Sequence, residues 1–269
     1  MPVSRINGID LSYDEFGSGE PVLLIAGTGA PGRIWRTHQV PALTAAGFRV
    51  ITVDNRGVAP SDLCEEGFTL ADMVADTAGL VEFLGAGPCR VVGFSMGAIL
   101  VQELLLVRPD LVRQAVLMAT RGRSDTLSRA MTEAELEVLD SKAGLPPRYE
   151  ALVRVMQGFS PRTLRDEATV RDWLDIFEMS PLSSSVSRSQ LEIDILPDRL
   201  SSYRNIGADC MVLAFADDLL TPPHLCREVA DSIPGSTYRE IPGCGHYGFI
   251  ERPAEVNSAL AEFFRGIRN

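Results

Sequence analysis

The segment Gly93-Phe94-Ser95-Met96-Gly97 places one serine between two glycines, at positions minus two and plus two. An apolar run typical of a buried strand precedes it, and an apolar helical pattern follows. A serine on a sharp turn from strand to helix needs small neighbours, because the backbone there folds back on itself. Such a turn lifts the hydroxyl off the sheet and places the positive end of the helix beneath it. The spacing predicts a nucleophile elbow carrying Ser95; the alternative, in a chain with 23 glycines, is a chance match.

A serine hydroxyl is a weak nucleophile near neutral pH, so it needs a general base that is itself held by a carboxylate. The chain has only three histidines. His38 falls inside a predicted helix and His224 follows two prolines at a predicted helix start, where packing, capping or surface roles are expected. His246 lies in a glycine-flanked loop directly after the last predicted strand. We therefore expect His246 to be the base.

The carboxylate that orients the base is expected at a strand end, between the serine and the histidine in chain order. Asp217 and Asp218 follow the predicted strand at 211–216 and are the two candidates. Two adjacent acids are also compatible with a plain solvated turn. The residues alone leave the choice between the two aspartates open.

These residues need a scaffold that brings the ends of several strands together. After an edge hairpin at 6–16, short apolar segments alternate with helical patterns along the chain. This alternation predicts an α/β fold, a parallel sheet with helices on both faces. Thr69 and Asp72 have the spacing of a capping box before one of these helices. The predicted buried strands are at 22–26, 50–54, 89–94, 115–119, 211–216 and 237–241.

The alternation breaks between about Arg121 and Arg204, where helical patterns occur without a convincing strand. Thr132 and Glu135 have capping-box spacing and predict a helix start there. Such an insertion is expected to lie over the carboxyl edge of the sheet, where open α/β sheets bind ligands; the alternative is that it extends the core. We expect an α/β core of residues 1–120 and 205–269 and a helical cap of residues 121–204.

Composition excludes several classes of function. The net charge of −11 opposes binding to nucleic acid and to anionic membranes. The five cysteines lack metal-ligand spacing, so neither a zinc site nor a disulfide framework is expected. The glycine-rich loop at 27–32 lacks the spacing of a phosphate or dinucleotide fingerprint, and it is either a flexible turn or a loop of backbone donors. Without a signal peptide or a membrane-spanning apolar run, we expect a cytoplasmic protein with no cofactor, no metal and no membrane partner.

Together these motifs resemble the α/β-hydrolase-fold superfamily, in its serine-nucleophile branch, over essentially the whole chain. In this family the acid usually lies four residues before a proline, which implies Asp218. The resemblance also implies that the amides of Met96 and Thr28 form the oxyanion hole. The family often has histidine before the glycine at 27, where this chain has Ala26, so the hydrogen bonds that brace this loop are expected to differ. The segments that carry the resemblance are 22–28, 54–61, 93–97, 218–222, 243–246 and 251–253.

The resemblance implies a serine hydrolase of the esterase, thioesterase or lactonase kind, similar also to cofactor-free haloperoxidases. Ser95 would form an acyl-enzyme with a small-molecule acyl substrate, with His246 as base and Asp218 as its partner. The alternatives are a ligand-binding or biosynthetic accessory protein on the same fold, and an acyltransferase. The sequence leaves the oligomeric state open. The predicted cap carries several large apolar side chains, which hint at a substrate with an apolar body, although such residues more often belong to a core. They are Met131, Met156, Phe159, Trp173 and Phe177.

Overall fold

A computed structural model describes residues 2–141, 144–180 and 187–266, and its centre is an eight-stranded sheet of order β1-β2-β4-β3-β5-β6-β7-β8. The β1–β2 and β2–β4 pairs are antiparallel, and every other pair is parallel. The predicted α/β fold with a mostly parallel sheet is confirmed. The strands are β1 (Val3–Ile6), β2 (Ile9–Phe16), β3 (Glu20–Ile25), β4 (Phe48–Asp54), β5 (Cys89–Phe94), β6 (Val112–Met118), β7 (Asp209–Phe215) and β8 (Thr237–Ile241).

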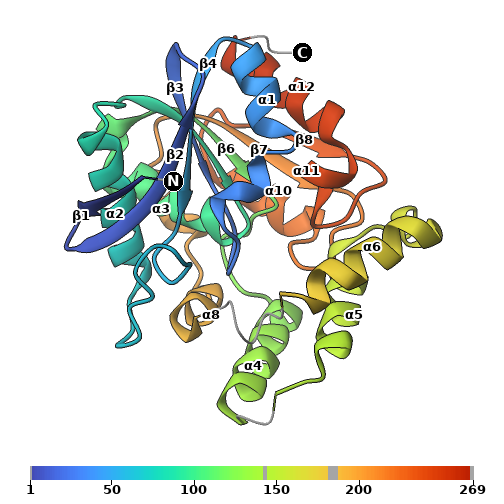
Figure 1. Ribbon diagram of the computed structural model, residues 1–269. Coiled ribbons are helices and arrows are strands. Elements are labelled where there is room, and N and C mark those ends of the chain that lie inside the picture. The colour runs from blue at the N-terminus through green and yellow to red at the C-terminus, as the bar shows by residue number, and fades with distance from the viewer. Residues whose placement is uncertain (1, 142–143, 181–186, 267–269) are drawn as a thin grey trace.

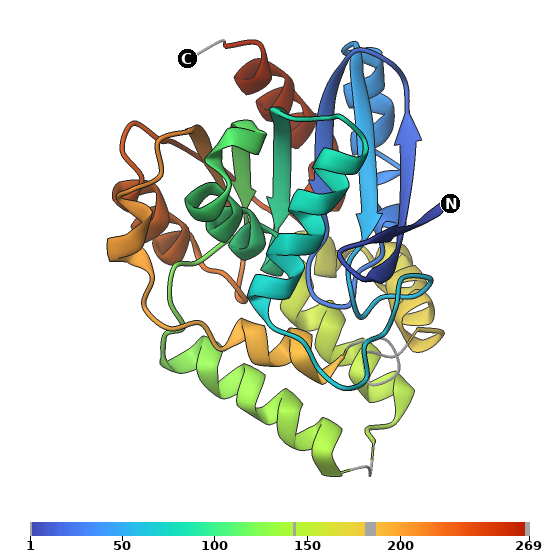
Figure 2. The ribbon, with the colours of Figure 1, turned by 90° about the vertical axis from the view of Figure 1, so that its left-hand side faces the viewer.

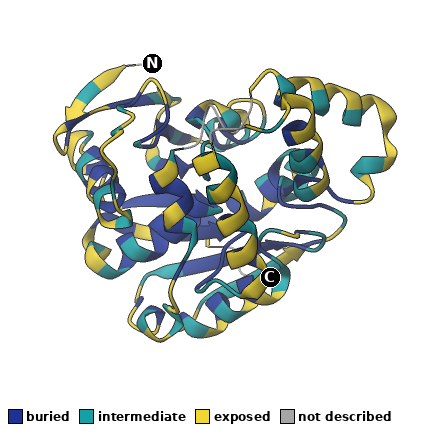
Figure 3. Ribbon diagram, turned by 90° about the horizontal axis from the view of Figure 1, so that it is seen from below, coloured by how far each residue is buried: buried dark blue, intermediate teal, exposed yellow. Residues whose placement is uncertain are grey.

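Helices cover both faces of the sheet, as Figure 1 shows. Because both faces are covered, the central parallel strands are buried along most of their length, and successive residues enter opposite layers. Val92 and Phe94 pack in the layer of α1 (Gln39–Ala45) and α12 (Pro253–Phe264), whereas Val91 packs in the other layer. That other layer holds α2 (Leu70–Phe83), α3 (Met96–Val107) and α10 (Pro223–Ser232). The buried strands between the two layers are dark blue in Figure 3.

Between β6 and β7 the described residues form helices joined by loops, without a strand among them. We call this segment the helical insertion; α4 packs on α8, and α5 packs on α6. The arrowheads of the parallel strands point toward these helices in Figure 2, so the insertion lies at the carboxyl edge of the sheet. Its last helix, α9, packs instead against α3 and α10 of the core. The elements are α4 (Thr126–Ser141), α5 (Pro147–Gly158), η3 (Thr163–Arg165), α6 (Glu167–Glu178), α8 (Arg188–Asp194) and α9 (Leu200–Tyr203).

The two predicted capping boxes have opposite outcomes. The Thr69 side chain accepts from the Asp72 amide and Asp72 accepts in return, so this prediction is confirmed. The prediction at Thr132 is wrong, because α4 already begins at Thr126. There the Asp125 carboxylate accepts from the Ser128 amide at 2.8 Å, and the Thr132 hydroxyl donates to the Ser128 carbonyl at 3.1 Å. A threonine inside a helix can donate its hydroxyl to the carbonyl four residues earlier, so threonine and glutamate at this spacing do not by themselves mark a helix start.

The structure also describes the cysteines and the lengths of the helices, which concern the expectations about disulfides and membrane-spanning segments. All five cysteines are free thiols, and all except Cys64 are buried. Across residues 2–141, 144–180 and 187–266, no helix is both long enough and apolar enough to cross a bilayer.

Candidate active site

Ser95 lies between the end of β5 and the start of α3, with φ of 56° and ψ of −123°. This left-handed backbone is strained for a residue with a side chain. Two glycines make the turn sterically accessible. A Cβ on Gly93 would lie 2.4 Å from the carbonyl oxygen of Gly97, and one on Gly97 would lie 2.5 Å from that of Ile25. The elbow predicted from the sequence is therefore present, and glycine is required on both sides of it.

The backbone around Ser95 is held at both ends. Its amide donates to the Met118 carbonyl at 3.0 Å, and its carbonyl accepts from the amides of Ala98 and Ile99 in the first turn of α3. Met96 is the first residue of α3, so the helix itself supplies no acceptor for its amide, and the helix dipole there favours negative charge.

His246 lies on the loop between β8 and α11 (Gly248–Glu251) and is 4% exposed. Its ring packs against Phe94, with 4.8 Å between ring centroids, which brings it beside the residue that precedes Ser95. Glu251 braces the loop by accepting from the Gly245 amide at 2.6 Å. The Tyr247 amide donates to the Gly158 carbonyl at 3.0 Å, tying the loop to the helical insertion. The structure thus places the predicted base next to the elbow.

Asp218, on the loop after β7, pairs with His246 through Oδ2 and Nδ1 at 2.8 Å. Burial by itself raises the pKa of Asp218, but attraction to His246 and hydrogen bonds from His246 and Thr221 outweigh it and hold the pKa below its ordinary value. A carboxylate bound to Nδ1 leaves Nε2 as the nitrogen available to a hydroxyl proton. Both aspartates border an adjacent cavity, and Asp218 is the one that pairs with His246.

Thr221 completes this group and was not expected from the sequence. Its hydroxyl donates to Asp218 Oδ2 at 2.7 Å and lies 3.3 Å from Nδ1 of His246. The amides of Leu220 and Thr221 donate to Asp218 Oδ1 at 2.8 and 2.9 Å. Both carboxylate oxygens are therefore satisfied while buried. A threonine three residues after an aspartate is a recurring local turn pattern, and this spacing was the available signal.

The loop after β3 approaches the serine closely, since a Cβ on Gly27 would lie 3.0 Å from that of Ser95. Two core residues hold the ends of this loop. The side-chain amide of Asn55 donates to the Ala26 carbonyl at 3.2 Å, and the Asp54 carboxylate accepts from the Gly32 amide at 2.8 Å. Thr28 lies between these anchors, one residue past Gly27. Its amide is therefore on the same loop that approaches Ser95 at Gly27.

The other two histidines are not part of this arrangement. His38 immediately precedes α1, and its carbonyl accepts from Asn257 at 3.2 Å. His224 lies in the first turn of α10 with its side chain 63% exposed, 3.9 Å from Asp125. Among the described residues, neither of these two histidines forms a hydrogen bond with Asp218 or a ring contact with Phe94, as His246 does.

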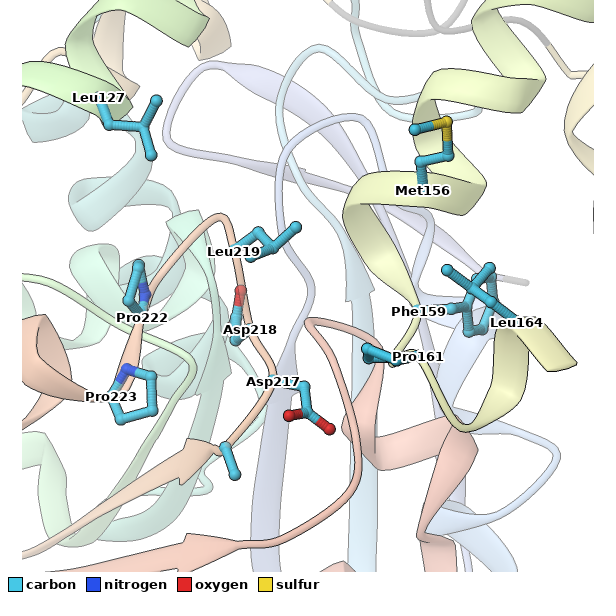
Figure 4. A pocket seen from close by; sticks show the side chains of 11 residues that line it. Leu127, Met156, Phe159, Pro161, Leu164, Asp217, Asp218, Leu219, Pro222 and Pro223 are labelled. Atoms are coloured by element: carbon cyan, nitrogen blue, oxygen red, sulfur yellow. The ribbon is translucent and has the colours of Figure 1, made fainter.

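A cavity of about 460 Å³ lies between the loop after β7 and the helical insertion. Figure 4 shows Leu127 of α4 on one side, Met156 and Phe159 on the other, and the loop with Asp217 and Asp218 between them. Most of its lining is apolar. Asp218, which pairs with His246, also lines this cavity. The lining residues are Leu127, Met156, Phe159, Pro161, Leu164, Ala216, Asp217, Asp218, Leu219, Pro222 and Pro223.

The aromatic residues of the insertion divide between this cavity and a small core. Phe159, Trp173 and Phe177 pack on one another, with 5.2 Å between the first two centroids and 5.3 Å between the last two. Trp173 and Phe177 therefore hold α5 on α6 and do not line the cavity. Met156 is 57% exposed and does line it. Of the five residues suggested for an apolar substrate, Met156 and Phe159 border this cavity.

Comparisons with known proteins agree with this architecture. The sequence profile of the "Alpha/beta hydrolase family" matches residues 22–259. The chain is 51% identical over 97% of its length, and 99% of the relative's, to "Putative non-heme bromoperoxidase BpoC" of Mycobacterium tuberculosis (strain ATCC 25618 / H37Rv). The crystal structure of that mycobacterial protein superimposes with a TM-score of 0.90, covering 96% of this chain and 97% of the other. A thermophilic esterase from Thermogutta terrifontis, at 26% identity and full coverage of both chains, superimposes with a TM-score of 0.86. The sequence, the sheet and the elbow lead to one conclusion: this chain belongs to the alpha/beta hydrolase family.

Proposed function

We propose that the protein is a serine hydrolase that cleaves a carboxylic ester, thioester or lactone through an acyl-enzyme on Ser95. The observation that carries the proposal is the buried 2.8 Å pair of His246 and Asp218, packed against the elbow through Phe94. A buried imidazole bound to a carboxylate beside a strained serine is the arrangement that activates a hydroxyl. The 26% identical esterase supports the same class of reaction.

In this proposal Ser95 attacks the carbonyl carbon while His246 takes the hydroxyl proton. His246 then returns the proton to the leaving group, and Asp218 stabilises the positively charged ring in between. The amides of Thr28 and Met96 donate to the oxyanion, and each such donor typically lowers the barrier by about 3 kcal/mol. Water, activated by His246, attacks the acyl-enzyme and releases the acid.

The cavity beside Asp218 supports a small substrate with an apolar body. Leu127 and Met156 come from opposite sides of the helical insertion, which in this proposal forms a cap over the substrate. Asp217 also borders this space, and the net charge of −11 repels anions. Uncharged acyl groups with short aliphatic or aromatic chains therefore fit best.

The test is covalent labelling of purified protein with a fluorophosphonate, read by intact mass. We expect one adduct per wild-type chain, none in Ser95→Ala, and turnover of p-nitrophenyl esters by wild type only. Well-folded wild type that forms no adduct would contradict the proposal and favour a binding protein. An adduct together with transfer to added alcohols in preference to water would instead identify an acyltransferase.

A second activity is favoured by the name of the 51% identical mycobacterial protein, a non-heme bromoperoxidase. Hydrogen peroxide in place of water would attack the acyl-enzyme, releasing a peroxy acid and free Ser95. The peroxy acid would oxidise bromide to hypobromite and return to the carboxylic acid. Bromination of monochlorodimedone in acetate, peroxide and bromide, lost in Ser95→Ala, is the expected result. Equal bromination by both proteins would contradict this second candidate.

A further inference from the structure

The loop that carries the proposed oxyanion amide of Thr28 is held by two side chains of α8. The Thr28 hydroxyl donates to Asp194 Oδ2 at 2.6 Å, and the amide of the next residue, Gly29, donates to Gln190 Oε1 at 2.7 Å. Gln190 and Asp194 are four residues apart and so share one face of the helix. Two consecutive loop residues are thus fixed by one helix of the insertion.

The core does not supply this support. Asn55 and Asp54 hold the two ends of the loop at Ala26 and Gly32. For the part of the chain that the structure describes, the hydrogen bonds from outside the loop to Thr28 and Gly29 come from α8. The position of the loop's middle, and with it the direction of the Thr28 amide, therefore depends on the insertion.

Both α8 side chains are themselves fixed. Gln190 is fully buried, and its amide group donates to the Arg56 carbonyl at 2.7 Å while its oxygen accepts from Gly29. This pairing determines which end of the amide faces the loop. A rotated side chain would lose both hydrogen bonds.

Asp194 occupies an unfavourable place for a carboxylate, at the carboxyl end of a helix, where unpaired carbonyls repel negative charge. Arg121 offsets this repulsion: its Nη2 donates to Asp194 Oδ1 at 3.1 Å and to the Asp194 carbonyl at 2.8 Å. Both side chains are largely shielded from solvent, at 7% and 14% exposed. A mostly buried ion pair at this position adds little net stability but fixes orientation.

We propose that Gln190 and Asp194 are positioning residues that hold the Thr28 amide in the geometry of an oxyanion hole. This inference rests on the proposed hydrolase function. It makes the oxyanion hole a joint product of the core and the insertion: the core supplies the Met96 amide, and α8 aims the Thr28 amide. Loss of either side chain should impair stabilisation of the tetrahedral oxyanion and leave substrate binding in the ground state intact.

The experiment compares Gln190→Ala, Asp194→Ala and Asp194→Asn with wild type, with active sites counted by fluorophosphonate labelling. For the two alanine variants we expect kcat per labelled site to fall about 10- to 100-fold, less than removal of a donor outright, with KM changed less than about threefold. Affinity for a trifluoromethyl ketone, whose hemiketal oxygen occupies the hole, should fall in parallel with kcat/KM. Asp194→Asn keeps an acceptor for Thr28 and should lose less than Asp194→Ala.

Ser189→Ala is the matched control. Ser189 is buried on the same helix and accepts from the Phe68 amide at 3.1 Å, so it also joins α8 to the core but away from the oxyanion loop. We expect it to lower the melting temperature and leave kcat per labelled site near wild type. If the α8 variants fail to fold, Thr28→Val removes the same hydrogen bond from the loop side and leaves the helix unchanged.

Equal kcat per labelled site in wild type, Gln190→Ala and Asp194→Ala would overturn the positioning role of Gln190 and Asp194 and leave the proposed hydrolase function standing. So would losses of kcat in Ser189→Ala as large as in the two alanine variants, since the effect would then be general loosening of α8. Wild type that neither labels nor turns over an ester would overturn the proposed function and this inference with it.

Discussion

The ring of Phe94 lies against the imidazole of His246 at 4.8 Å between centroids and 44° between planes. Phe94 is the last residue of β5, directly before Ser95, and it also packs against Phe249, with 4.8 Å between ring centroids. The proposed base is therefore positioned by the strand that ends in the proposed nucleophile, as well as by Asp218 on its Nδ1 side. The aromatic packing and the carboxylate together fix the plane of the imidazole.

Replacing the acid should separate the roles of the two adjacent aspartates. Asp218→Asn presents an amide donor to Nδ1, so the ring adopts the tautomer in which Nε2 carries a proton and cannot accept one from Ser95. We expect kcat for an ester to fall about 10³- to 10⁴-fold with KM little changed. Asp217→Asn is the matched control and should stay close to wild type. A comparable loss in Asp217→Asn would contradict the assignment of Asp218.

Removing the Thr221 hydroxyl tests whether its hydrogen bond stabilises the Asp218 carboxylate. Thr221→Val keeps the shape of the side chain but removes the hydroxyl. Asp218 Oδ2 then loses the hydrogen bond that this hydroxyl donates at 2.7 Å. The expected loss is about 1–3 kcal/mol in the free energy of unfolding, with a fall in kcat, because the buried carboxylate loses a partner. Urea denaturation and ester kinetics measure the two effects. Thr221→Ser, which keeps the hydroxyl, should retain most of both quantities; a loss equal to that of Thr221→Val would argue against this hydrogen bond.

The elbow glycines should not tolerate a methyl group. In Gly93→Ala the new Cβ would lie 2.4 Å from the Gly97 carbonyl oxygen and 2.6 Å from the Ala98 Cα, and neither backbone atom has room to move. We expect destabilisation of at least about 3 kcal/mol or failure to fold, measured by thermal unfolding and soluble yield. Gly207→Ala, where no atom lies within 4 Å of the new Cβ, should stay within about 0.5 kcal/mol of wild type. Similar yields and melting temperatures for both variants would show that the turn is less tightly packed.

Stability should depend on pH through Asp218. Its pKa is lowered from the ordinary value of 3.8 in the folded protein, so its ionised form contributes stability above that value. The contribution is lost as pH falls through the folded pKa. The difference in unfolding free energy between wild type and Asp218→Asn should therefore shrink as pH falls from about 5 to below about 4. Carboxyl groups that do not interact with Asp218 titrate equally in both proteins and cancel in the difference. A difference that stays constant down to pH 2.5 would contradict the lowered pKa.

Narrowing the cavity should change the preferred acyl chain. Met156→Trp adds bulk at the cavity wall, so kcat/KM for long p-nitrophenyl esters should fall about 10-fold relative to the acetate, since each methylene excluded loses about 1–3 kcal/mol. Met179→Trp makes the same substitution at a residue that is 79% exposed and outside the cavity lining. The ratio of long to short substrates should stay unchanged there. An unchanged ratio in Met156→Trp would mean that the acyl chain lies elsewhere.

Local patterns in the sequence determined the alternation of strands and helices, the edge hairpin, the elbow at Ser95 and the capping box at Thr69. Each depends on residues close together in the chain: apolar periodicity, glycines two positions from a serine, or a threonine three positions from an aspartate. The same locality explains the wrong helix start at Thr132, because that pattern is equally compatible with a helix interior. The structure distinguishes a helix start from a helix interior here, because it shows the Asp125 carboxylate accepting from the Ser128 amide at the true start of α4.

Only the tertiary structure decided how distant segments meet. The residues alone left Asp217 and Asp218 open, and the family pattern implied the second; the bond to His246, 28 residues away, depends on how the loops after β7 and β8 leave adjacent strands. Gln190 and Asp194 meet the loop of Thr28 and Gly29 across 161 and 166 residues, and no local pattern marks them. Long-range hydrogen bonds between polar side chains and loop backbones follow from the packing of whole elements. Apolar periodicity and glycine spacing, by contrast, are short-range properties that the sequence itself contains.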